Sequence, residues 1–413
     1  MTIYFVAGEV SADNHGAALM RSLRELDPGL TFTGRGGPQM QAVAGKQFKN
    51  WLGDAAVLGL WEVLRKYGYF REQFRETLKE VLESKPDAVV LIDYPGFNLR
   101  LARALRRRSP RQKIIYYISP QIWAWNRGRI KGMARSLDLV LCIFPFESDL
   151  YNESGLHAIF VGHPMIERLQ AQKIDAERDP NLIGLFPGSR LREVRKIFPV
   201  MIETARLLLQ DNPSLHFEVA AASEELAQEI SELLAINPLS RAREEKATEA
   251  AADRSAPTPP LPSSSGEGRM SGATPQGFEV IQIAVGETAT LMQRAFVGIV
   301  ASGSATLEAA YFRMPFVLIY KVAWPTYLGA RLVVNVEYLG MPNLLAGKEV
   351  VPEFIQHRAD PGAIAGVMRP LMEDAPAREQ MISEFDTIIG KLGTGGATER
   401  AARAVIEEIS DGA

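Results

Sequence analysis

The sequence predicts an α/β protein with two Rossmann-like, doubly wound parallel-sheet domains that face an interdomain cleft. Short apolar runs typical of buried parallel strands recur along the chain, and small-residue turns and helical segments follow them. These strand–turn–helix units return every ~25–30 residues, as expected for alternating strands and helices around a parallel sheet. The length of 413 residues is too great for one compact core and indicates two domains.

The first domain is expected over residues 1–170. Its strands are predicted at residues 3–7, 30–37, 87–93, 113–119, 137–144 and 158–161. The first strand leads into a turn at residues 8–13, and a helix is expected from His15 to Leu26. A first strand that enters a glycine turn is where an α/β sheet places its ligand crevice.

Two basic segments of this domain each have two interpretations. Residues 58–74 form an amphipathic, aromatic helical face with basic flanks, which fits either an interfacial membrane helix or a helix packed on its own domain. Seven basic residues lie between positions 100 and 113, and four more lie between 127 and 135. They form either a solvated helix face or a surface for anionic lipid or phosphate.

The second domain is expected over residues 181–375, after a polar linker at residues 170–181. Its strands are predicted at residues 182–186, 216–220, 278–283, 297–300 and 316–320. Residues 239–277 are rich in Ala, Pro, Ser and Gly and predict a disordered surface insertion. The helices of residues 376–413 are expected to cross back to the first domain.

A phosphate-binding turn is predicted at residues 184–193, which read GLFPGSRLRE. Gly188 and Ser189 end a strand, and a helix follows from Leu191 with Ser189 as its candidate cap. The free N–H groups and dipole of such a helix favour an anion, and Arg190 adds a guanidinium. The alternative is an ordinary strand–turn–helix unit with a surface arginine.

A second small-residue turn, ASGSATLE, follows the strand at residues 297–300. It opens a helix at Ser304, and Glu308 lies one turn inside, where a carboxylate can accept hydrogen bonds from ribose hydroxyls. A capped helix with a solvated glutamate is the alternative. Two such turns in one domain favour a nucleotide site.

Asp93 is the candidate general base, because a carboxylate at the carboxyl end of a strand, beside proline and aromatic residues, is placed to take a proton. A helix cap or a structural acceptor is the alternative role. Glu9 and Asp13 are further acidic groups at the same sheet edge, and each could cap its helix instead.

Composition excludes several classes of protein. The net charge of −3 argues against a nucleic-acid partner. The single cysteine, Cys142, lies in an apolar run and is expected to be buried, with no disulfide framework. No metal-ligand spacing, P-loop or nucleophile elbow occurs, so no metal or cofactor is expected. The chain begins with a strand and has no run of ~20 uncharged apolar residues, which predicts a cytoplasmic protein or one attached to a membrane surface.

Taken together, nine segments resemble the lipid-A-disaccharide synthase family, glycosyltransferases of family 19 with the GT-B fold. The segments are GEVSAD (8–13), GRGGPQM (34–40), IDYPGFN (92–98), YYISPQIWAW (116–125), PFE (145–147), FVGHP (160–164), PGSRLREV (187–194), SGSATLE (302–308) and PNLLAGKEVVPEFIQ (342–356). Ala12 stands where the family usually has glycine, and the insertion at residues 239–277 is not an expected family feature.

The resemblance implies an inverting glycosyltransferase that joins UDP-2,3-diacylglucosamine to 2,3-diacylglucosamine 1-phosphate (lipid X) and releases UDP. It implies that Asp93 deprotonates the acceptor 6-hydroxyl and that Glu9, Ser11 and Asp13 line the acceptor side. The residues implied to bind the UDP-sugar are Gly188, Ser189, Arg190, Glu193, Ser302, Gly303, Ser304, Thr306, Glu308 and Asn343.

The implied partners are these two lipids and an anionic membrane surface, and the implied location is the cytoplasmic face of the inner membrane. Two rival functions stay open at this point: a UDP-sugar epimerase or hydrolase of the same fold, and a non-catalytic nucleotide-sugar binding protein. The sequence leaves open whether the chain forms a homodimer and which acyl-chain length it prefers.

Overall fold

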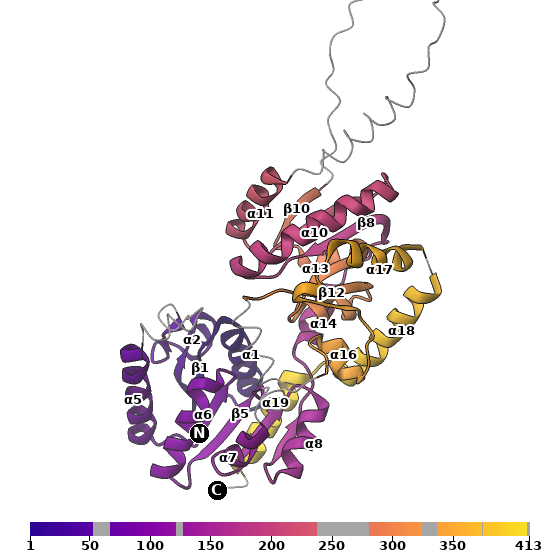
Figure 1. The fold of residues 1–413 in the computed structure, drawn as a ribbon. Helices are drawn as coiled ribbons and strands as arrows, with labels where there is room; N and C mark the ends of the chain where they lie inside the picture. The colour runs from indigo at the N-terminus through magenta and orange to yellow at the C-terminus, as the bar shows by residue number, and fades with distance from the viewer. Residues whose placement is uncertain (53–66, 121–126, 238–280, 324–336, 374, 411–413) are drawn as a thin grey trace, which may run out of the picture. The chain divides into compact units, whose positions relative to one another are not determined.

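The computed structural model describes residues 1–52, 67–120, 127–237, 281–323, 337–373 and 375–410. They form two compact units, residues 1–171 with 390–410 and residues 172–323 with 337–389. Each unit is an α/β domain with one parallel sheet, which confirms the predicted fold class (Figure 1).

The sheet of the first unit has the strand order β3-β2-β1-β4-β5-β6-β7. Its strands are β1 (Thr2–Ala7), β2 (Thr31–Gly36), β3 (Lys49–Asn50), β4 (Ala88–Ile92), β5 (Lys113–Tyr117), β6 (Leu139–Cys142) and β7 (Ala158–Phe160). The order reverses between β1 and β4, because the chain first builds outward from β1 to β3 and then returns to the other side of β1. Cys142 is buried at the end of β6, as predicted.

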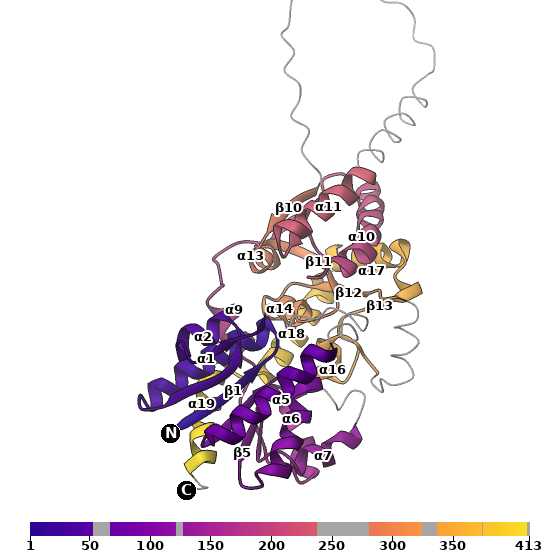
Figure 2. The same cartoon turned by 90° about the vertical axis from the view of Figure 1, so that its left-hand side faces the viewer.

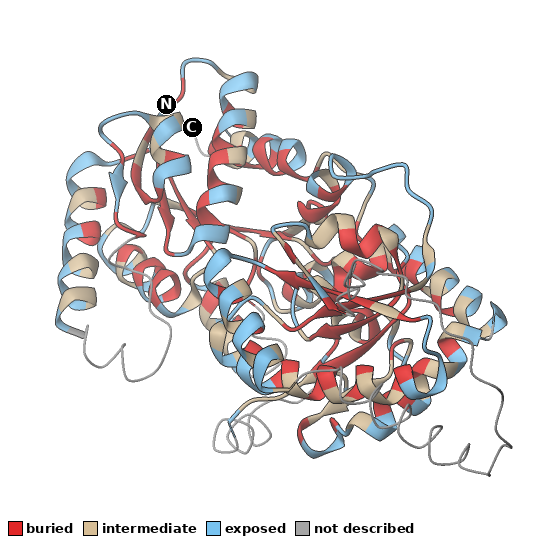
Figure 3. Cartoon of the chain, turned by 90° about the horizontal axis from the view of Figure 1, so that it is seen from above, coloured by how far each residue is buried: buried red, intermediate tan, exposed pale blue. Residues whose placement is uncertain are grey.

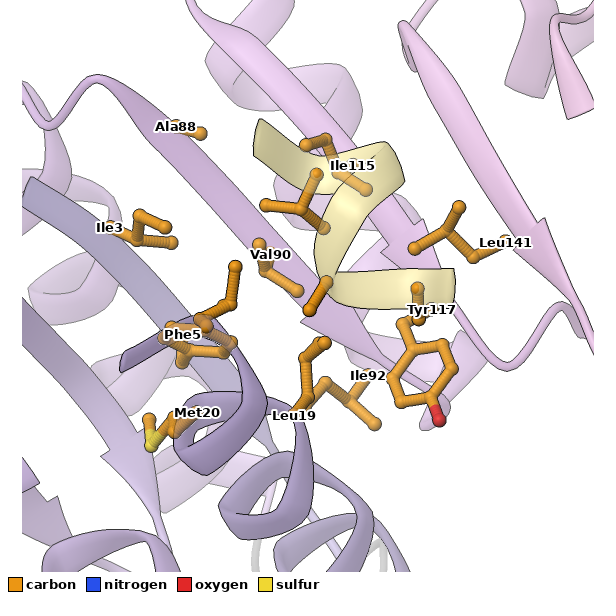
Figure 4. Close-up of a cluster of buried hydrophobic side chains, with 14 of the residues drawn as sticks. Ile3, Phe5, Leu19, Met20, Ala88, Val90, Ile92, Ile115, Tyr117 and Leu141 are labelled. Atoms are coloured by element: carbon orange, nitrogen blue, oxygen red, sulfur yellow. The ribbon is translucent and has the colours of Figure 1, made fainter. Parts of the chain in front are cut away.

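Helices cover both faces of this sheet. They are α1 (Val10–Leu26), α2 (Pro38–Ala44), α5 (Tyr67–Ser84), α6 (Pro95–Arg108), the 3₁₀ turn η2 (Arg127–Arg129), α7 (Ile130–Ala134), α8 (Pro145–Glu153), α9 (Met165–Gln170) and α19 (Ala397–Ser410). Alternate residues of a strand face opposite sides, so Val90 and Ile92 pack with α1 and α19, whereas Val89 and Leu91 pack with α5 and α6. Figure 4 shows the first of these two cores, and Figure 2 shows the unit from the side.

Helix α5 is fixed to its own domain by a buried arginine. Arg35 of β2 is only 2% exposed, and its guanidinium bonds to Glu76 at 3.0 Å and Glu80 at 2.6 Å. Phe70 and Phe74 of the same helix pack against the core below. For residues 67–74 the structure therefore supports packing on the domain. Residues 58–66 of the predicted amphipathic face lie outside the described residues.

The sheet of the second unit repeats the same topology, with the order β10-β9-β8-β11-β12-β13. Its strands are β8 (Asp179–Phe186), β9 (His216–Ala221), β10 (Ile281–Val285), β11 (Ala295–Ala301), β12 (Phe316–Tyr320) and β13 (Glu353–Ile355). Here the order reverses between β8 and β11. In Figure 3 the strands of the sheets are largely buried, and many of the helices turn exposed residues outward.

The helices of the second unit are α10 (Leu191–Asp211), α11 (Glu224–Ile236), α13 (Thr288–Arg294), α14 (Ala305–Tyr311), α16 (Met341–Ala346), η3 (Gln356–Arg358) and α17 (Pro361–Glu373). Helix α18 (Ala375–Lys391) then leads back to the first unit, where α19 packs against α1. Lys113 of β5 is bonded to Glu408 of α19 at 2.6 Å.

Some predicted boundaries were wrong. Helix α1 begins at Val10 and not at His15, because Ser11 and Asp13, residue types common in turns, form its first turn. Strand β8 begins at Asp179, within the predicted linker, because its polar first residues extend beyond the apolar core and Asp179 pairs with Ala295. The short strands β3 and β13 were not predicted, because each has only two or three residues.

The predicted insertion at residues 239–277 lies outside the described residues. No helix in the described part of the chain combines the length and hydropathy needed to cross a bilayer.

Candidate functional site

In the first unit, two predicted site segments meet where the strand order reverses. β1 and β4 are parallel neighbours, and Ala7 pairs with Ile92. Gly8 and Asp93 are the residues that follow each strand, so the two turns begin side by side at one edge of the sheet. In open α/β sheets this edge, at the point of reversal, is where ligands bind.

The Asp93 side chain is half-buried at this edge, and its environment favours the protonated form. Burial raises the pKa of Asp93 above its usual range, and the Glu9 carboxylate raises it further, whereas a hydrogen bond from the Tyr94 N–H lowers it. A carboxylate with a raised pKa is a stronger base, which suits proton abstraction.

Position 8, the first residue after β1, has no room for a side chain because the Tyr94 ring lies against it. A Cβ atom at Gly8 would lie 2.3 Å from the Tyr94 Cδ1, well inside van der Waals contact. The Tyr94 ring in turn packs against Trp51 and Phe97. The two turns therefore interlock through one aromatic ring. Glu9 and Ser11 are exposed beside them.

Asp13 is buried, whereas Glu9 and Ser11 are exposed. It is 1% exposed, and its carboxylate accepts hydrogen bonds from the backbone N–H groups of Gly37 (2.8 Å), Gln39 (2.9 Å) and Met40 (3.0 Å). These are the free donors at the N-terminus of α2. Asp13 thus caps a helix, as the sequence allowed, but the helix is α2 and not its own.

In the second unit, the two glycine turns also meet at the reversal of strand order. β8 and β11 are parallel neighbours, and Phe186 pairs with Val300. The turn after β8 contains Gly188, whose φ of +110° is a conformation that disfavours residues with a Cβ. A Cβ there would also lie 2.6 Å from the Glu193 carboxylate. The glycine lets the turn pass close to the first turn of α10.

Arg190, not the predicted Ser189, is the N-cap residue of α10. Its backbone is extended and its side chain makes no capping bond, whereas its carbonyl accepts from the N–H groups of Glu193 at 2.9 Å and Val194 at 3.0 Å. The side chain is 71% exposed and lies 3.2 Å from Glu193. Ser189 precedes it and is also exposed.

The turn after β11 is stiffened by its own hydrogen bonds. The Ser302 N–H donates to the Ile319 carbonyl of β12 at 3.0 Å, and the buried Thr306 hydroxyl donates to the Gly303 carbonyl at 2.8 Å. Gly303 (φ +148°) and Ser304 are exposed, and Glu308 lies in the first turn of α14. Ser304 is the N-cap of α14 but makes no side-chain capping bond.

Tyr320 lies close enough to Glu193 and Arg190 to interact with their charges, and the sequence analysis did not single it out. It is the last residue of β12, the neighbour of β11. Burial raises the pKa of Tyr320, the Glu193 carboxylate raises it further, and Arg190 opposes the shift. These three side chains therefore share one environment. A tyrosine at the end of an apolar strand carries no signal in the sequence that separates it from a core residue.

Asn343 is buried and uses its amide within its own segment. Its Nδ2 donates to the Val351 carbonyl at 2.7 Å and to Glu353 at 2.9 Å, and its Oδ1 accepts from the N–H groups of Val350 and Val351, each at 2.8 Å. The structure thus places the Asn343 side chain as a brace between α16 and β13.

The chain is similar over almost its whole length to known proteins. A family model described as lipid-A-disaccharide synthetase matches residues 3–252 and 275–402, which leaves out part of the predicted insertion. A lipid-A-disaccharide synthase of Geobacter sulfurreducens is 35% identical over 415 residues, covering 98% of this chain and 97% of that protein. One from Myxococcus xanthus is 34% identical, covering 99% and 98%.

Solved structures share the fold at low identity. A UDP-GlcNAc 2-epimerase of Neisseria meningitidis, bound to UDP-GlcNAc, has a TM-score of 0.56 at 10% identity, covering 98% of this chain and 99% of that one. A trehalose-6-phosphate synthase has a TM-score of 0.51 at 11% identity, covering 99% of both chains.

The contacts of Asp13 predict a large effect on stability. Asp13→Ala leaves buried backbone donors of α2 unpaired, so we expect a loss of about 2–4 kcal/mol in the free energy of unfolding. Ser11→Ala, on the same helix turn but exposed, is expected to change it by less than about 0.5 kcal/mol. Denaturant unfolding of the two variants measures both values. Equal stabilities would contradict the capping role of Asp13.

Proposed function

This chain belongs to the lipid-A-disaccharide synthetase family, and on that premise we propose how its residues carry out the reaction. The chain is a glycosyltransferase that makes lipid A disaccharide, and one of its substrates is a nucleotide sugar. We propose UDP-2,3-diacylglucosamine as the donor and 2,3-diacylglucosamine 1-phosphate (lipid X) as the acceptor. The product would be the β-1,6 disaccharide 1-phosphate with UDP.

Asp93 is the proposed base. The donor is an α anomer and the product is β, so the acceptor 6-hydroxyl oxygen attacks the anomeric carbon from the face opposite UDP in one displacement. The hydroxyl proton passes to the Asp93 carboxylate, and UDP leaves with the electrons of the broken bond. The raised pKa of Asp93, from burial and then from Glu9, is the observation that carries this assignment.

The two turns of the second unit are the proposed site for UDP. Gly188, Ser189 and Arg190 would hold the diphosphate through α10 N–H groups and a guanidinium. The support is that the Arg190 side chain is exposed at the N-terminus of α10, with an ion pair to Glu193 in the same turn. The neighbouring turn would hold the nucleoside, with Glu308 accepting from ribose, together with Ser302, Gly303, Ser304 and Thr306.

Asp13 and Asn343, two of the predicted site residues, are proposed to hold neighbouring segments in place and not to contact substrate. Asp13 would hold the turn at Gly37 in place, and Asn343 would hold the segment from α16 to β13. The reason is that each side chain is hydrogen-bonded to backbone groups inside the protein. Glu9 and Ser11, which are exposed, would contact the acceptor.

The rival functions rest on weaker similarity. The epimerase shares 10% identity with this chain, which reports the fold alone. A non-catalytic binding protein would not need a carboxylate with a raised pKa at the edge of its sheet.

A membrane surface is the proposed location, because both substrates carry acyl chains. Helices α6 and α7 adjoin, since a Cβ at Gly132 would lie 3.3 Å from a guanidinium nitrogen of Arg103. Exposed basic residues extend over both helices and include Arg100, Arg107, Lys131 and Arg135. Such a surface attracts anionic lipid at the inner face of the membrane.

Asp93→Asn tests the base. We expect turnover of disaccharide and UDP to fall by about 100-fold or more, with UDP affinity unchanged, because the amide cannot accept the proton. Asp149→Asn, an exposed acid on α8, is the control and is expected to keep full turnover. Normal activity of Asp93→Asn would remove Asp93 as the base.

Arg190→Ala tests the phosphate turn. Loss of the guanidinium should weaken UDP binding by about 1.5–3 kcal/mol, the size of a charge-assisted contact. Isothermal titration with UDP measures this, with Lys196→Ala, one turn along α10 and exposed, as the control. The same UDP affinity in both variants would count against the turn.

Vesicle sedimentation tests the basic surface. We expect binding to phosphatidylglycerol vesicles but not to phosphatidylcholine vesicles. The pair of changes Arg100→Gln and Arg107→Gln should weaken that binding about 10-fold or more, at ~1 kcal/mol per basic residue. Arg21→Gln with Lys46→Gln, exposed on α1 and beyond α2, is the control. Equal losses in both pairs would refute this surface.

A further inference from the structure

The backbone carbonyl of Asp93 is held by two side chains. The Asn98 Nδ2 donates to it at 2.8 Å, and the Tyr116 hydroxyl also donates to it. The Asn98 amide donates as well to the Ile92 carbonyl at 3.1 Å. On the other side, the Asp93 N–H donates to the Tyr117 carbonyl of β5 at 3.1 Å. The peptide groups on both sides of the Asp93 Cα are thus fixed.

These bonds hold an unfavourable backbone conformation. Asp93 and Tyr94 have φ angles of +46° and +50°, in the left-handed region. That region costs roughly 1–2 kcal/mol for each residue other than glycine. Two such residues in succession keep their conformation only where the surrounding structure holds them. Without the two donors, the more favourable conformations would turn the Asp93 side chain elsewhere.

The burial of Asn98 and Tyr116 indicates that their polar atoms serve contacts inside the protein. Both are completely buried. Asn98 lies in the first turn of α6, and within the described residues its Oδ1 atom has no hydrogen-bond partner. Burying an unpaired amide oxygen is unfavourable, and a leucine would fill a similar volume without that cost. The role of the Asn98 amide at this position is therefore to donate hydrogen bonds from Nδ2 to the carbonyls of Ile92 and Asp93.

We propose that Asn98 and Tyr116 are positioning residues that clamp the Asp93 carbonyl and so aim its carboxylate at the acceptor hydroxyl. The proposal rests on the assignment of Asp93 as the base and adds two residues to it. Neither residue touches substrate; both act through the backbone of Asp93. Correct aim matters because a small misplacement of a catalytic group lowers the rate strongly.

Tyr116→Phe tests the clamp, because it removes one donor and keeps the ring. Tyr117→Phe is a matched control: Tyr117 is the next residue of β5, is equally buried and faces the opposite side of the sheet. We expect Tyr116→Phe to lower kcat about 10-fold or more, with UDP affinity unchanged. Tyr117→Phe should keep the kcat of the wild type.

The pH profile supplies a readout that a purely structural role would not move. Burial is the main cause of the raised pKa of Asp93. When the turn is released, the Asp93 carboxylate becomes more exposed to water, so its pKa falls and the acid limb of kcat/KM moves to lower pH. Asn98→Leu, which removes both amide donations, should show the same two changes.

The outcomes separate the two proposals. If Asp93→Asn is inactive while Tyr116→Phe and Tyr117→Phe have the same kcat and the same acid limb, the clamp is wrong and the base stands. Equal losses in both tyrosine variants, without a shift of the limb, also overturn the clamp. If Asp93→Asn keeps its turnover, the base assignment fails and the clamp fails with it.

Discussion

The reversal of strand order in each parallel sheet is the constraint on which the rest of the site depends. In the first unit it makes β1 and β4 neighbours, and in the second it makes β8 and β11 neighbours. The connections on the two sides of a reversal leave in opposite directions, so the carboxyl ends of these strands stay open. All the exposed polar residues assigned to substrate follow one of these four strands.

The two units use this edge for different chemistry. In the first, burial raises the pKa of the Asp93 carboxylate and Glu9 raises it further, which suits the proposed base. In the second, a glycine turn and the N-terminus of α10 adjoin the exposed Arg190 guanidinium, which suits the proposed anion site. The same fold thus gives the proposed base in one unit and the proposed phosphate site in the other different surroundings, through the side chains that follow the strands.

Buried polar side chains set the shape of these turns. Asp13 bonds to three backbone donors at α2, Asn343 bonds to the loop before β13, and Asn98 bonds to the carbonyls after β4. Each of these side chains fixes the backbone of a turn or loop through its hydrogen bonds. Loss of such a group leaves its partners unpaired in the protein interior, which costs more than the bond itself contributes.

The sequence by itself determined the fold class, the strands with apolar runs, the two glycine turns and Asp93, because apolar periodicity and small-residue turns are local signals. Only the tertiary structure decided which polar residues of the motifs remain exposed, as Glu9 and Arg190 do, and which are used internally, as Asp13 and Asn343 are. It also identified Tyr320, Tyr116 and Asn98 near the site. The physical reason is that burial and hydrogen-bond partners depend on how the folded chain packs around a side chain, which no local pattern records.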